Sequence, residues 1–92
     1  MSDRVQVLLE GRVQGVGYRY ATYQKAKELG VKGYVKNLPD GRVEAVFEGP
    51  NDKLKSILAW CERGGPRFAR VDNVEVNWLE GKSHYRDFSV VD

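Results

Sequence analysis

Residues 11–19 read Gly11-Arg12-Val13-Gln14-Gly15-Val16-Gly17-Tyr18-Arg19, and they connect two segments with different periodicities. Before them, apolar and polar residues alternate over residues 5–9, which is typical of a strand with one buried face. After them, residues 20–29 have the apolar spacing of a helix, and Gly30 is a suitable C-terminal stop. The stretch therefore predicts a glycine-rich loop that runs from a strand into a helix.

The glycines of this loop predict a site for an anion, most often a phosphate. Glycine lets the backbone curl so that successive N–H groups point at one position, and a helix N-terminus adds its partial positive charge there. Arg19 lies where the loop becomes the helix, and its planar guanidinium matches phosphate oxygens. The plainer alternatives are that the glycines only permit a tight crossover and that Arg19 is a solvated surface residue. A cation at a helix N-terminus is mildly unfavourable, and this cost favours a bound anion as its partner.

The middle of the chain predicts a hairpin followed by a second helix. Residues 31–37 and 42–48 read as strands, and residues 38–41 (Leu-Pro-Asp-Gly) have the chemistry of a tight turn. Residues 50–52 (Pro-Asn-Asp) offer caps for the helix, and residues 64–66 (Gly-Gly-Pro) end it. The expected apolar faces are Tyr18, Thr22, Ala26 and Leu29 in the first helix, and Leu54, Ile57, Leu58 and Cys61 in the second.

The last third of the chain predicts two more strands. One starts near Ala69 and alternates over residues 74–78, and a short terminal strand lies around Phe88 and Val90. The resulting order is β-α-β-β-α-β with a short extra strand. This order predicts a single domain over residues 1–92, an α+β two-layer sandwich with two helices on one face of an antiparallel sheet.

Length and composition indicate a soluble globular domain. The chain has 92 residues, of which 41% are hydrophobic and 30% charged. No apolar run approaches the roughly 20 residues that a membrane span requires, and the first residues lack the apolar segment of a secretory signal. The single cysteine, Cys61, excludes an internal disulfide framework and a multi-cysteine metal site. We therefore expect a cytoplasmic protein without a metal or a membrane partner, and nothing demands more than a monomer.

The positive charge of the chain is concentrated around the glycine loop. Residues 11–36 contain six basic residues and one acidic residue. Because the whole chain has 15 basic and 13 acidic residues, nine basic and twelve acidic residues remain elsewhere. A local field of this kind raises the concentration of anionic ligands. Lys25, Lys27 and Lys32 have the plainer interpretation of solvated surface residues, whereas Arg12 and Arg19 lie within the loop itself.

Several stretches together resemble the acylphosphatase family, in order and with matching spacing. They are residues 11–19 quoted above, Gly33-Tyr34-Val35-Lys36-Asn37, Asp40-Gly41-Arg42-Val43, Glu48-Gly49-Pro50 and Tyr85-Arg86-Asp87-Phe88-Ser89-Val90. The resemblance implies a ferredoxin-like fold and the hydrolysis of acyl phosphates without a metal or other cofactor. By position it implies that Arg19 binds the phosphate and that Asn37 holds the attacking water. The expected phosphate-binding residues are Gly11, Arg12, Val13, Gln14, Gly15, Val16, Gly17 and Arg19.

The chemistry of this reaction is compatible with the residue types present. The leaving group of an acyl phosphate is a carboxylate, a weak base that needs no general acid, and the only histidine, His84, lies in a polar segment. Phosphoryl transfer then requires positioning of the phosphate and of an in-line water. The amide of Asn37 can accept a hydrogen bond from water and donate one, whereas a carboxylate there would repel the substrate. We expect the water's proton to pass to a phosphate oxygen.

Three alternatives remain at this point. Asn37, before a turn, has the plainer interpretation of a residue that shapes the hairpin locally. The same strand–helix order occurs in RNA-recognition domains, so a non-catalytic module that binds an anion or RNA is the main rival. Such domains need further aromatic residues on their central strands, and the only one that residues 42–48 provide is Phe47, whose spacing from Val43 and Ala45 predicts that it faces inward with them. A third interpretation is the acylphosphatase-like module of a larger carbamoyl-transferring enzyme.

Overall fold

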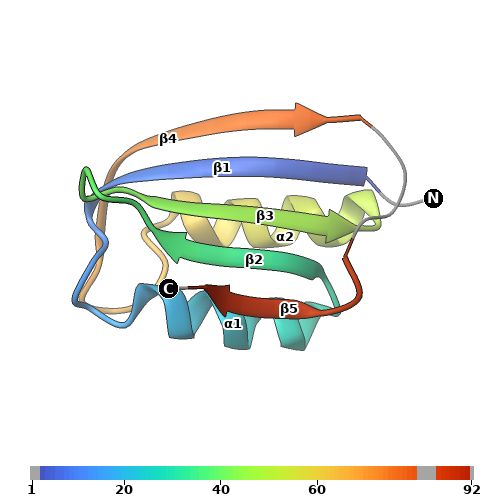
Figure 1. Cartoon of the computed structure of the whole chain (residues 1–92), viewed down its shortest axis with the longest axis horizontal. Coiled ribbons are helices and arrows are strands. Elements are labelled where there is room, and N and C mark those ends of the chain that lie inside the picture. The colour runs from blue at the N-terminus through green and yellow to red at the C-terminus, as the bar shows by residue number, and fades with distance from the viewer. Residues whose placement is uncertain (1–2, 81–84, 92) are drawn as a thin grey trace.

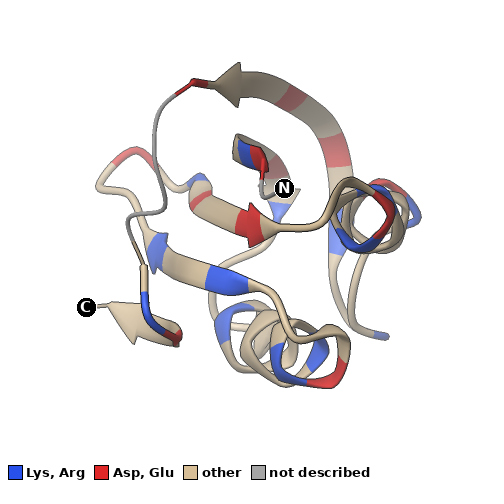
Figure 2. Ribbon diagram, turned by 90° about the vertical axis from the view of Figure 1, so that its right-hand side faces the viewer, with Lys and Arg blue, Asp and Glu red and all other residues tan. Residues whose placement is uncertain are grey.

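The structure is a computed structural model that describes residues 3–80 and 85–91. His84 lies outside the described residues. The elements are β1 (Asp3–Arg12), α1 (Tyr18–Leu29), β2 (Lys32–Asn37), β3 (Val43–Gly49), α2 (Asn51–Glu62), β4 (Arg70–Leu79) and β5 (Phe88–Val91). The five strands form one sheet in the order β4-β1-β3-β2-β5, and both helices cover the same face of it (Figures 1 and 2). The predicted two-layer α+β sandwich is confirmed.

The register of the sheet explains two departures from the predicted elements. β1 runs beyond residue 9 to Arg12, because a bulge between Glu10 and Gly11 lets it keep pairing with β4. The sheet is antiparallel except at one edge, where β5 pairs in parallel with β2, and Val35 is opposite Val90. This parallel pairing brings the C-terminal strand beside the end of β2 that carries Asn37.

The core lies between the sheet and the two helices. The predicted inward positions of the third strand, Val43, Ala45 and Phe47, are fully buried. On the helices, buried side chains recur at the spacing of one face. The buried positions are Tyr18, Thr22 and Ala26 in α1, and Leu54, Ile57, Leu58 and Cys61 in α2. Both predicted faces are therefore confirmed, apart from Leu29, which is only partly buried.

The two ends of α1 adopt the same left-handed conformation. Gly17 is the N-cap residue with φ 77° and ψ 19°, and Gly30 is the C-cap residue with φ 73° and ψ 22°. The predicted stop at Gly30 is confirmed. The expected capping of α2 by side chains of residues 50–52 is not observed. Pro50 is the N-cap residue and no side-chain hydrogen bond caps the helix, and the side-chain amide of Asn51 donates to the Asp3 carboxylate instead.

The distribution of charge follows the layers of the fold. Figure 2 shows Lys and Arg on β2 and along α1, whereas Asp and Glu recur along β4 at the far edge of the sheet.

In the described part of the chain, neither helix combines the length and apolar character needed to cross a membrane.

Candidate active site

The loop between β1 and α1 exposes a set of backbone donors. Gly15 and Gly17 both have φ near +75°, at 73° and 77°, and a Cβ at either position would meet nothing within 4 Å. Glycine is required there by the backbone conformation and not by crowding. The first bond of the helix runs from the Ala21 amide to the Gly17 carbonyl at 3.0 Å. Within the described residues, the amides of residues 14–18 donate no hydrogen bond, so they form an array of donors at the N-terminus of α1.

A cavity of about 220 Å³ lies against this loop. It is formed by the N-terminus of α1, the end of β2 and the C-terminal strand β5. The lining residues are Val13, Gly15, Gly17, Tyr18, Arg19, Tyr20, Asn37 and Val90. The structure therefore brings together Arg19 and Asn37, which are 18 positions apart in the sequence, with three residues of the predicted phosphate-binding loop.

The side chain of Arg19 is held at the rim of the cavity by the C-terminal strand. Its Nη1 donates a hydrogen bond to the Val91 carbonyl oxygen at 3.1 Å. β5 is in turn fixed by its pairing with β2, in which Lys36 is opposite Val91. The guanidinium is thus positioned beside the loop amides, where a planar cation can bind the oxygens of a tetrahedral anion.

The side chain of Asn37 presents a buried oxygen without a partner. Asn37 is the last residue of β2 and is opposite Val43 in the β2–β3 ladder. Its Oδ1 atom is buried and makes no hydrogen bond within the described part of the chain. A buried acceptor left without a donor costs about 1–3 kcal/mol. Because Asn37 lines the cavity together with Arg19, its carboxamide is a group to which a bound water or ligand can donate a hydrogen bond.

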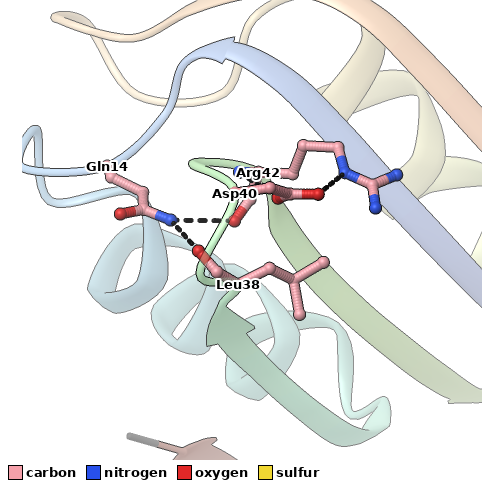
Figure 3. A network of polar contacts seen from close by, with 4 residues as sticks. All are labelled: Gln14, Leu38, Asp40 and Arg42. Carbon is pink, nitrogen blue, oxygen red and sulfur yellow. Dashed lines mark hydrogen bonds and ion pairs between the residues drawn. The ribbon is translucent and has the colours of Figure 1, made fainter.

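Four of the predicted phosphate-binding residues do not line the cavity. Gly11 and Arg12 belong to β1 and pair with Val71 and Arg70 of β4, and a Cβ at Gly11 would collide with the Arg70 carbonyl oxygen. Gly11 is therefore required for the close approach of two strands. Val16 packs against the hydrophobic core. The side chain of Gln14 points to the β2–β3 hairpin (Figure 3).

Three further residues line the cavity without having been assigned to it from the sequence. Tyr18 is buried and packs against Trp60, as expected for a core residue, and burial together with the nearby Cys61 raises the pKa of its hydroxyl. Tyr20 is 56% exposed, and Val90 comes from β5. The exposed position of Tyr20 on α1 carries no periodic signal, and the place of Val90 depends on the parallel pairing of β5.

The described residues contain no group of three or more His, Cys, Asp and Glu side chains that is arranged to hold a metal ion. The cavity instead offers backbone amides, one guanidinium and one carboxamide. These groups bind the oxygens of an anion and a water molecule directly.

The sequence and the fold both match known acylphosphatases. The family model described as Acylphosphatase matches residues 5–90. An acylphosphatase from Caldanaerobacter subterraneus subsp. tengcongensis is 49% identical over 90 residues, which cover 98% of this chain and 99% of that relative. The crystal structure of acylphosphatase from Bacillus subtilis superposes with a TM-score of 0.91 at 36% identity and covers 100% of both chains. The chain belongs to the acylphosphatase family, and its fold is the ferredoxin-like α+β sandwich that the resemblance implied.

A larger protein contains a region with the same fold. HypF from T. kodakarensis superposes on 99% of this chain with a TM-score of 0.84 and 31% identity. The match covers only 12% of the HypF chain. The similarity thus concerns one small part of that protein.

Proposed function

We propose that the protein hydrolyses the carboxyl–phosphate anhydride of acyl phosphates to a carboxylate and inorganic phosphate. The loop amides of residues 14–18 and the guanidinium of Arg19 bind the phosphoryl oxygens. Asn37 Oδ1 accepts a hydrogen bond from the attacking water. The observation that carries this proposal is the buried, unpartnered Oδ1 of Asn37, a residue that lines the same cavity as Arg19 and the loop.

The reaction needs few groups because its leaving group is a weak base. Water attacks phosphorus in line, the bond between phosphorus and the bridging oxygen breaks, and the acyl group leaves as a carboxylate. The charge of the loose transition state is spread over the three equatorial oxygens, where backbone donors and a fixed cation stabilise it. One proton of the water stays on the attacking oxygen and the other passes to a phosphate oxygen, so the products are a carboxylate and dihydrogen phosphate.

The test is a hydrolysis assay with acetyl phosphate and benzoyl phosphate in the presence of EDTA. We expect turnover of both acyl phosphates, competitive inhibition by inorganic phosphate, and no turnover of phosphate monoesters such as p-nitrophenyl phosphate. A protein that binds phosphate but hydrolyses neither acyl phosphate would support the alternative of a non-catalytic anion-binding module. Hydrolysis that stops with EDTA and returns with a divalent cation would contradict the metal-independent part of the proposal.

The roles of the two side chains are separated by their variants. Arg19→Ala should raise the inhibition constant of phosphate and lower kcat, because the arginine contacts the anion in the ground state as well as in the transition state. A fixed arginine on a transferring phosphoryl group is worth about 10³–10⁵ in rate. Asn37→Ala should lower kcat by about 10²–10³, which is the usual cost of removing one hydrogen-bonding group that acts in the transition state. The inhibition constant of phosphate should stay unchanged.

The proposal extends to the state of the chain in the cell. We infer that residues 1–92 act as one domain, as a cytoplasmic monomer that takes small acyl phosphates and not nucleic acid. The acidic residues along β4, on the opposite edge of the sheet from β5, support the last point because they repel a polyanion. Sedimentation equilibrium tests the monomer, fractionation tests the compartment, and a filter-binding titration with single-stranded RNA tests the absence of nucleic-acid binding.

A further inference from the structure

The two halves of the candidate active site come from segments that are not adjacent in the sequence. The phosphate-binding half is the loop before α1, and the water-binding half is Asn37 at the end of β2. In-line attack requires the water held by Asn37 to face the phosphorus held by the loop. A displacement of about 1 Å in such a geometry costs on the order of 10²-fold in rate. The fold therefore needs a contact that fixes the loop relative to the end of β2.

Gln14 makes that contact. Its Nε2 atom donates one hydrogen bond to the Leu38 carbonyl oxygen and one to the Arg42 carbonyl oxygen, both at 2.9 Å (Figure 3). Leu38 directly follows Asn37, and Arg42 directly precedes Val43, the ladder partner of Asn37. The side chain thus binds both ends of the turn that connects β2 and β3, and each bonded carbonyl is one residue from the Asn37–Val43 pair.

The contact uses the full donor capacity of a primary amide. An amide nitrogen carries two N–H groups, and both are used here. The two carbonyls also accept bonds within the hairpin, from the Gly41 amide at 3.1 Å and from the Leu38 amide at 2.8 Å, so both lone pairs of each oxygen are engaged. A carboxylate at position 14 would repel both oxygens, and an apolar side chain would leave the loop and the hairpin without a polar link.

We propose that Gln14 is a positioning residue that fixes Asn37, and with it the attacking water, relative to the phosphate bound by the loop. This inference rests on the proposed function. It assigns to the Gln14 side chain a role outside the anion contacts, because that side chain points to the hairpin and does not line the cavity. The phosphate-binding half has anchors of its own, since Arg19 donates to the Val91 carbonyl oxygen and the loop runs directly into α1.

The test compares Gln14→Met with a control in the same hairpin, Asp40→Ala. Methionine keeps the length of the side chain and removes both donors. Among the residues that the structure describes, Asp40 binds only within the hairpin, where its Oδ1 accepts from the Arg42 amide at 3.1 Å and its Oδ2 accepts from Arg42 Nε at 2.9 Å (Figure 3). We expect Gln14→Met to lower kcat for benzoyl phosphate about 10- to 100-fold without changing the inhibition constant of phosphate. Asp40→Ala should change neither kcat nor the inhibition constant of phosphate, although it also perturbs the hairpin.

A double variant shows whether Gln14 acts through Asn37. If it does, Gln14→Met combined with Asn37→Ala should lower kcat no further than Asn37→Ala alone. The inference would be overturned if the double variant lost kcat by the product of the factors of the two single variants. It would also be overturned if Gln14→Met kept the wild-type kcat, or if its inhibition constant for phosphate rose as kcat fell. If Gln14→Met does not fold, Gln14→Asn, which is one methylene too short to reach both carbonyls, is measured in the same way. A wild-type protein that hydrolyses no acyl phosphate would instead refute the proposed function itself, and the inference with it.

Discussion

The role of the glycine loop can be tested by exploiting the symmetry of α1. Gly17 and Gly30 flank this helix in nearly the same left-handed conformation, and a Cβ at either position would meet nothing within 4 Å. Alanine at either position therefore introduces backbone strain without a steric collision. The strain of a non-glycine residue in this region is about 1–2 kcal/mol. Only Gly17 lines the cavity, so Gly30→Ala is a matched control for Gly17→Ala.

We expect Gly30→Ala to lose stability by the full strain and Gly17→Ala to lose less, because its free loop can relieve part of that strain. A domain of this size shifts its Tm by about 4–8 °C for each kcal/mol, which makes the loss measurable by thermal unfolding. In Gly17→Ala the free loop relieves its strain by turning away from the left-handed conformation, and phosphate binding must restore that conformation. Because 1.4 kcal/mol corresponds to a factor of about 10 in affinity, the inhibition constant of phosphate should rise about 5- to 30-fold. In Gly30→Ala it should remain at the wild-type value.

The assay is competitive inhibition of benzoyl phosphate hydrolysis by inorganic phosphate, measured for both variants at a temperature below their unfolding transitions. Comparable losses of Tm with an unchanged inhibition constant in Gly17→Ala would refute the argument, because the loop conformation would then contribute nothing to anion binding. An equal rise in both variants would also refute it, since the effect would come from the general destabilisation of α1.

Further predictions concern the core and its response to pH. Gly33→Ala should prevent folding, because its Cβ would collide with the Val46 carbonyl oxygen in the adjacent strand, and circular dichroism would show the loss. Leu54→Ala should cost about 2–5 kcal/mol in urea unfolding, since Leu54 is fully buried. Burial raises the pKa of the Cys61 thiol from about 9 to about 12, so above pH 9 only the unfolded chain ionises this group. The contribution of this thiol to the free energy of unfolding should therefore fall by about 1 kcal/mol between pH 8 and pH 10, so the free energy should fall less steeply with pH in Cys61→Ala.

Much of the local structure could be predicted from the sequence, because local structure depends on neighbouring residues. Apolar residues at helical spacing identified the inner faces of α1 and α2, and the turn between β2 and β3 followed from its residue types. Glycine spacing next to a helix start predicted the donor array, and the structure has Gly15 and Gly17 in the left-handed conformation that such an array uses. Each of these features is a property of backbone dihedral angles within a few residues.

Other features of the site depend on segments that are distant in the sequence. Periodicity indicates which face of a strand is buried, but it does not indicate which strand lies beside it. For that reason the sequence did not predict the parallel pairing of β5 with β2, which brings Val90 to the cavity and Val91 to Arg19. It also did not separate Gly11, required by the close approach of β4, from the glycines of the donor array.

The direction of a side chain within a loop is the last feature that only the tertiary structure decided. Gln14 belongs to the predicted phosphate-binding stretch, yet its side chain binds the carbonyls of Leu38 and Arg42 in the hairpin. The sequence by itself determined the donors of the loop, the cation at the helix start and the carboxamide before the turn. Their arrangement around one cavity required the folded sheet, because hydrogen bonds between distant segments form only where the backbone of one segment is brought within reach of the other.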